Sequence, residues 1–72
     1  MLNIYFTRHS KNRMRWRKIS PEIVKLVLEN PDRIENKGEN NFDYYRNIEG
    51  ITYKVFCSLN DSNFVIKSAV KK

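Results

Sequence analysis

The sequence predicts one α+β domain, in which two N-terminal helices pack on a three- or four-stranded antiparallel sheet. The chain has 72 residues, too few for two domains. Its first half carries two helix-start signals, and its second half alternates apolar and polar residues between turns. A domain of this size forms about one layer of helix on one sheet.

The first predicted elements are a short strand and a polar helix. Residues 2–6 are apolar and aromatic, which is typical of a strand. Thr7 is a suitable N-cap for a helix over residues 8–18. The large apolar residues of this helix are Met14 and Trp16. We therefore expect it to pack by a narrow edge, with Trp16 in the core; a stacking platform for a base is the alternative role of this residue.

The second helix has clear start and stop signals. Ser20 can cap it, Pro21 suits its first position, and Glu22 is favourable near its positive N-terminus. An apolar stripe follows, and Asn30 before Pro31 ends the helix.

The remainder predicts a β-meander. Glu49–Gly50 is a turn signal between the two longest strands. Strands are expected at residues 32–35, 42–48, 51–59 and 64–70. The series expected to face the helices is Ile51, Tyr53, Val55, Cys57 and Leu59. Lys54 then lies on the open face of the sheet, and the strand register decides whether Tyr44 or Tyr45 joins it.

Charge points to the class of partner. The net charge is +6, and residues 1–20 hold six Lys and Arg side chains and no acid. Seven of the eight acids lie in residues 22–49, so one positive face forms if the two ends of the chain meet. A basic surface of this kind favours a nucleic acid, with RNA ahead of DNA.

Composition also bears on location. No apolar run is long enough to cross a membrane, and the N-terminus lacks the features of a signal peptide. Cys57 is the only cysteine, so no internal disulfide forms, and we expect a reducing cytoplasm. A buried, inert thiol is the expected state of Cys57.

The first helix carries the strongest candidate site. His9, Arg13 and Arg17 follow at four-residue spacing, and Asn12 and Trp16 flank them. Guanidinium groups bind phosphate, an indole can stack on an unpaired base, and an imidazole can move a proton near neutral pH. The alternatives are a structural histidine and a solvated arginine face.

Further candidates come from the rest of the chain. Lys54 joins His9, Arg13 and Arg17 as a candidate catalytic residue. The candidate nucleic-acid contacts are Arg8, Lys11, Arg15, Trp16, Tyr45, Arg46 and Lys67. One histidine and one cysteine do not make a zinc site, and no Gly-rich phosphate loop is present, so we expect neither a metal nor a cofactor.

The stretch from His9 to Pro31 carries a family resemblance. Its order is His9, Arg13-Met14, Arg17, Ile19-Ser20, Glu22, Val24 and then Leu28-Glu-Asn30-Pro31. It resembles a bacterial and archaeal family of small domains of unknown function, which is similar to the BrnT toxins and more distantly to the RelE/ParE superfamily. Lys18 departs from the pattern, since glycine is common there. The resemblance implies two helices on an antiparallel sheet, with His9, Arg13 and Arg17 as the motif residues.

The resemblance also implies a function. It implies metal-independent RNA cleavage by a toxin that an acidic antitoxin protein neutralises, with the ribosome as a further candidate partner. Two alternatives stay open: a non-catalytic nucleic-acid-binding module, and a protein-interaction domain that binds an acidic partner.

Overall fold

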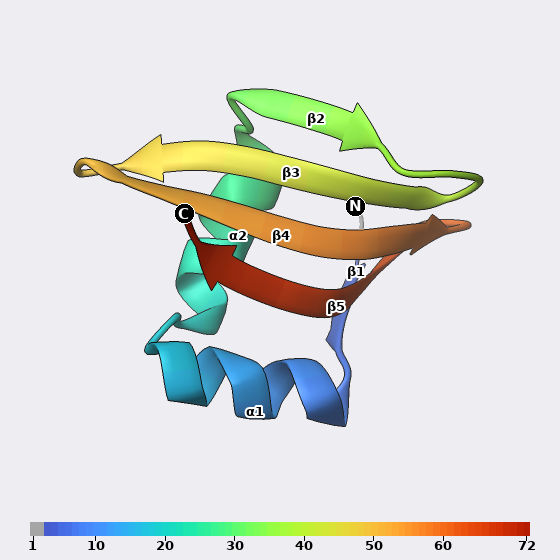
Figure 1. Cartoon of the computed structure of the whole chain (residues 1–72). Coiled ribbons are helices and arrows are strands. Elements are labelled where there is room, and N and C mark those ends of the chain that lie inside the picture. The colour runs from blue at the N-terminus through green and yellow to red at the C-terminus, as the bar shows by residue number, and fades with distance from the viewer. Residues whose placement is uncertain (1–2) are drawn as a thin grey trace.

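The computed structural model describes residues 3–72, and these form a five-stranded sheet with two short helices (Figure 1). The strands are β1 (Asn3–Phe6), β2 (Arg33–Asn36), β3 (Asn41–Ile48), β4 (Ile51–Asn60) and β5 (Asn63–Lys71). The helices are α1 (Arg8–Arg17) and α2 (Pro21–Glu29). Residue 2, which was expected to open the first strand, lies outside the described part.

The sheet is mixed, and this corrects the predicted fold. The strand order is β1-β5-β4-β3-β2, with β1 parallel to β5 and the other pairs antiparallel. A three- or four-stranded antiparallel sheet under two helices was therefore wrong. The cause is the pairing of β1 with β5, which joins the two ends of the chain and leaves no local signal in the sequence.

Both helices begin where the capping signals predicted. The Thr7 hydroxyl accepts a hydrogen bond from the Ser10 amide at 3.0 Å, and the Ser20 hydroxyl accepts one from the Ile23 amide at 3.3 Å. These bonds satisfy amide groups that have no partner within a helix. Lys18 ends α1 in the left-handed region, with φ of 56°.

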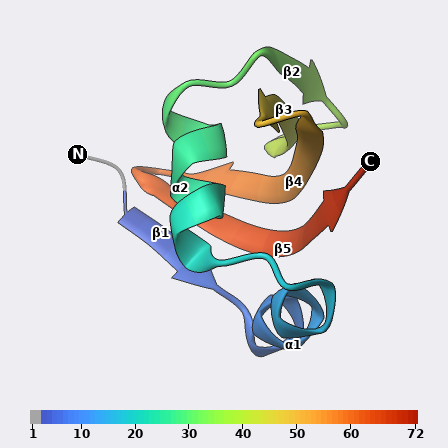
Figure 2. The same ribbon diagram turned by 90° about the vertical axis from the view of Figure 1, so that its left-hand side faces the viewer.

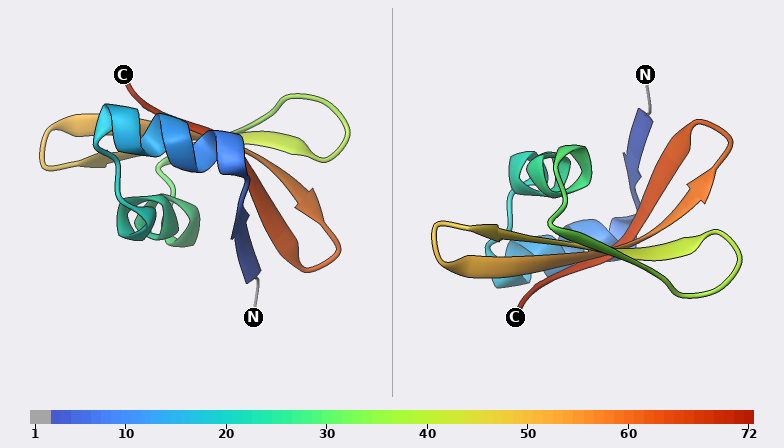
Figure 3. Two further views of the ribbon diagram at one scale, coloured as in Figure 1. Left: turned by 90° about the horizontal axis from the view of Figure 1, so that it is seen from below. Right: turned by 90° about the horizontal axis from the view of Figure 1, so that it is seen from above.

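The two helices cover different parts of the sheet. Helix α2 packs on one face, against β3 and β4, while α1 lies beside β5 (Figures 1 and 2). The core between α2 and the sheet contains Val24, Val27, Val55, Cys57 and Ile66, each at most 1% exposed. The face of the sheet away from α2 is called the open face below (Figure 3).

A β-bulge in β5 sets which side chains reach the core. Cys57 pairs with Ile66, but Phe56 pairs with Ser68, so Lys67 is the extra residue. The bulge shifts the alternation, and Ile66 and Ala69 both become buried.

No helix in residues 3–72 combines the length and the apolar character that crossing a membrane requires.

Candidate functional site

The outer side of α1 forms a shallow pocket, called the α1 pocket. Ser10 and Met14 point into the fold, at 0% and 3% exposure, and so orient the helix. The pocket has a volume of about 450 Å³. It is lined by His9, Asn12, Arg13, Trp16 and Arg17. The structure therefore brings together the imidazole, both guanidinium groups and the indole that the helical spacing predicted.

Trp16 is on the surface, and the expectation that it joins the core was wrong. Its exposure is 89%, the highest among the exposed large apolar residues. Met14 and Trp16 are two residues apart, which places them about 200° apart around an α-helix. Because Met14 is buried, Trp16 must face solvent, and its ring is free to contact a ligand.

The two arginines of the pocket are in different states. The Arg17 guanidinium donates a hydrogen bond to the carbonyl oxygen of Ala69 at 3.0 Å. This carbonyl lies beyond the end of β1 along β5, where the strand edge would otherwise lack a partner. In the described residues, no hydrogen bond or ion pair involves the Arg13 guanidinium. Arg17 thus helps to dock α1, whereas Arg13 is available to an anion.

A second hollow lies on the open face of the sheet. Its volume is about 480 Å³. It is lined by Arg13, Lys37, Asp43, Lys54, Phe56, Ser68 and Val70. Arg13 therefore borders both hollows, and it connects the α1 pocket with Lys54, the candidate catalytic residue of the sheet.

The strand register explains which side chains meet on the open face. Asp43 pairs with Phe56, and Phe56 pairs with Ser68, so these three form one row across the sheet. Lys54 lies in the next row, between Tyr45 and Val70. The register thus places Tyr45 on the open face, while Tyr44 packs in the core.

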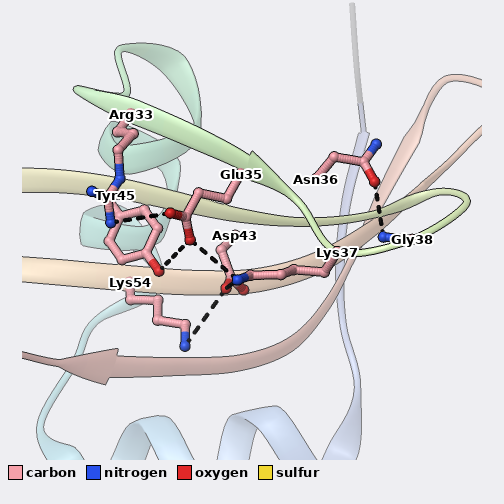
Figure 4. Close-up of polar contacts among 8 residues, drawn as sticks. All are labelled: Arg33, Glu35, Asn36, Lys37, Gly38, Asp43, Tyr45 and Lys54. Carbon is pink, nitrogen blue, oxygen red and sulfur yellow. Dashed lines mark hydrogen bonds and ion pairs between the residues drawn. The ribbon is translucent and has the colours of Figure 1, made fainter.

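A buried carboxylate organises the charges of this face. The Asp43 side chain is 3% exposed, and its Oδ2 lies 3.6 Å from Lys54 Nζ and 3.8 Å from Lys37 Nζ (Figure 4). Lys37 also pairs with Glu35 at 3.3 Å. Hydrogen bonds from Tyr45 and Lys37 lower the pKa of Glu35, and the Glu35 carboxylate raises the pKa of Lys37. Both groups are therefore held in their charged forms.

Tyr45 and Arg46 lie in places that limit their contact with a ligand at the α1 pocket. The Tyr45 ring is covered by Arg33, whose Cζ lies 4.4 Å from the ring centre, and by Lys72 at 5.3 Å. Its hydroxyl donates to Glu35 at 3.0 Å. Arg46 instead donates to the carbonyl oxygen of Leu26 on α2, at 3.0 Å.

The remaining candidate contacts are spread over other surfaces. Lys11 and Arg15 line a hollow on the other side of α1 with Phe6 and Ile19, and Arg8 is exposed at the start of this helix. Lys67 donates to Asn41 at 3.2 Å, and its ammonium lies 5.6 Å from the centre of the Phe56 ring. Lys67 thus lies beside Phe56, which lines the open-face hollow.

Sequence reasoning missed Asp43, Lys37 and Phe56 as members of a charged hollow. The alternation along residues 42–48 did indicate that Asp43 faces away from the core. Successive side chains of a strand point to opposite faces, and Tyr44, the neighbour of Asp43, is apolar enough to face the core. Burial raises the pKa of the Cys57 thiol to about 12, which agrees with the expected inert state.

Comparison with protein families, curated proteins and solved structures finds no match for this chain.

Proposed function

We propose that the protein binds single-stranded RNA at the α1 pocket and cleaves it without a metal ion, as a toxin-like endoribonuclease. The observation that carries the proposal is the Trp16 indole, 89% exposed beside His9 and Arg13 in one pocket. Stacking of an unpaired base on an aromatic ring contributes about 1–3 kcal/mol. An exposed aromatic ring beside the Arg13 guanidinium, which is unpaired within the described residues, can bind a nucleotide, because the base stacks on the ring while the phosphate binds the guanidinium.

The cleavage chemistry needs a proton acceptor and a positive group beside the phosphate. The ribose 2′-oxygen forms a bond to phosphorus while the bond from phosphorus to the 5′-oxygen breaks. His9 takes the proton of the 2′-hydroxyl, and the 5′-oxygen receives a proton from a water molecule. Arg13 binds the phosphate oxygens, with Arg17 beside it on the same helix. The products are a 2′,3′-cyclic phosphate and a free 5′-hydroxyl.

Charge and motif support the toxin assignment. Helix α1 contains no acidic residue in its first turn and two arginines in its last, so its free face attracts anions. The motif over residues 9–31 resembles a family of small domains of unknown function, and the similarity of that family to the BrnT toxins and, more distantly, to the RelE/ParE superfamily points the same way. An acidic antitoxin would cover this positive surface, and the ribosome is a candidate site of action. We assign the protein to the cytoplasm, and the single cysteine, Cys57, which has no partner for an internal disulfide, supports this assignment.

The test is an end-labelled, mixed-sequence RNA incubated with the protein in EDTA, which removes contaminating metal nucleases. Discrete fragments ending in a cyclic phosphate are expected from the wild type, and a DNA of the same sequence should stay intact because it lacks the 2′-hydroxyl. His9→Ala should stop cleavage while RNA binding persists. Lys25→Gln, an exposed charge change on α2, is the matched control.

Non-catalytic RNA binding is the second candidate function. The observation that favours it is that His9 is the one side chain lining the α1 pocket that can act as a general acid or base, whereas cleavage transfers one proton from the 2′-hydroxyl and another to the leaving oxygen. Intact RNA in every lane would refute cleavage of free RNA. Intact RNA in the same assay with ribosomes, together with binding that depends on Trp16 and Arg13, would establish this alternative.

A further inference from the structure

The open-face hollow has the charge of an anion site. Three cationic side chains line it, Arg13, Lys37 and Lys54, and Asp43 is its one acidic residue. The lining residues thus carry a net charge of +2, and Glu35, which pairs with Lys37 at 3.3 Å, offsets part of it. Phe56 and Val70 are half-buried and form an apolar floor between the charged groups. An apolar surface beside a cation strengthens the attraction for an anion, because less water competes.

Lys54 is held in place while its hydrogen-bond donors stay free. Its Nζ lies 3.6 Å from Asp43 Oδ2, beyond the range of a good hydrogen bond. In the described part of the chain, no hydrogen bond uses the Lys54 ammonium. Asp43 thus holds the ammonium by charge alone, and all three N–H groups can turn to a ligand.

Asp43 has a positioning role at this hollow. Its Oδ1 is buried and has no hydrogen-bond partner among residues 3–72. A buried carboxylate oxygen without a partner is costly, and native proteins keep few of them. A phosphate cannot satisfy this oxygen, because both groups only accept hydrogen bonds, so Asp43 acts on the lysines and not on the ligand. Its effect here is to gather Lys37 and Lys54 above the middle of the sheet (Figure 4).

We propose that this hollow is a second phosphate-binding subsite, in which Lys54 and Arg13 hold the phosphate next to the one bound at the α1 pocket. The inference rests on the proposed function, since it extends the same RNA strand. Arg13 lines both hollows, so a strand that leaves the α1 pocket past Arg13 meets Lys54. The substrate is then RNA of at least three linked nucleotides, because these contain two linking phosphates, and Asp43 is the positioning residue for Lys54.

Inorganic pyrophosphate tests the subsite without RNA. We expect saturable shifts of the backbone amide signals of Phe56 and Ser68 in ¹⁵N NMR spectra. Lys54→Gln should raise the dissociation constant about tenfold, as loss of one charge-assisted hydrogen bond does. Lys25→Gln, which changes the same charge on α2, should leave it unchanged. Shifts that do not saturate, or that are the same in Lys54→Gln, would overturn the subsite.

The salt dependence of oligouridylate binding, followed by Trp16 fluorescence, separates the subsite from the proposed function. Each phosphate contact with a single strand adds about 0.7 to the slope of log K against log salt. Lys54→Gln should lower the slope by about this amount, and Lys25→Gln should not. Tight RNA binding with an unchanged slope overturns the subsite alone. Absence of RNA binding by the wild type overturns the proposed function, and the pyrophosphate titration then decides whether an anion site exists without it.

Discussion

Replacing Trp16 with alanine separates ligand binding from folding, because the indole has few contacts within the fold. The residue is 89% exposed, so about one-tenth of its surface is covered. A tryptophan buries up to about 250 Å² in a core, and burial contributes about 25 cal/mol per Å². The covered tenth is then worth about 0.7 kcal/mol. We expect Trp16→Ala to lower the free energy of unfolding by no more than this.

The same substitution should strongly weaken RNA binding. Loss of one stacked base costs about 1–3 kcal/mol, which is a factor of about 5 to 150 in the dissociation constant. Trp16→Phe keeps an aromatic face and should recover most of the affinity. The assays are urea unfolding followed by circular dichroism, and fluorescence anisotropy with a labelled oligouridylate.

Met14→Ala is the matched contrast on the same helix. Met14 is 3% exposed, and removing a buried methionine costs about 2–5 kcal/mol. It should destabilise the fold, while the fraction that stays folded binds RNA normally. The reasoning would be refuted if Trp16→Ala unfolded the protein as Met14→Ala does, or if it left RNA affinity unchanged.

Three further predictions each rest on one local feature: a backbone angle, a hydrogen bond and a buried thiol. Lys18→Gly should raise the free energy of unfolding by about 0.5–1 kcal/mol, because Lys18 has φ of 56°, and urea unfolding would measure it; no gain would show that the left-handed position is not strained. Arg17→Ala should cost about 1 kcal/mol through its lost bond to Ala69, whereas Arg13→Ala should leave stability unchanged and reduce only RNA affinity; equal losses in the same unfolding assay would contradict this. Burial raises the pKa of the Cys57 thiol from its ordinary value of 9.0 to about 12. Between these two pH values the folded protein keeps the thiol proton, whereas the unfolded chain loses it. Stability should therefore be intact below pH 9 and fall by about 1.4 kcal/mol per pH unit above it, and Cys57→Ala should remove this slope in urea unfolding at pH 8 to 10.5.

Local elements were predictable from the sequence because their signals are local. Thr7 and Ser20 cap the helices in the structure as their positions in the sequence indicated. The Glu49–Gly50 turn also forms, with both residues at positive φ. The pairing of β1 with β5 was not predictable in this way. It depends on contacts between residues about 60 positions apart, and a short apolar strand fits several edges equally well.

The candidate site was predictable on α1 and only partly on the sheet. Helical spacing alone placed His9, Arg13 and Trp16 on one side, and the burial of Met14 confirms that orientation. The exposure of Trp16 followed from the same geometry, but its size and apolar character suggested the core. On the sheet, the position of Lys54 relative to Arg13 required the register and the packing of α1 beside β5, which no local pattern contains.

The acidic middle of the chain has a different effect from the one its composition suggests. In sequence, it separates two basic ends and would be expected to oppose them. In the fold, Glu35 and Asp43 lie on the open face beneath lysines, and each of them pairs with Lys37. Asp43 also fixes Lys54 within a hollow that Arg13 of α1 borders. Acidic residues placed in this way reduce the net charge but order the remaining cations, and an ordered cation loses less entropy when it binds a phosphate. Net charge alone predicts that removing the Asp43 charge strengthens anion binding. Because the same change also releases Lys37 and Lys54 from their fixed positions, we expect the gain to be offset.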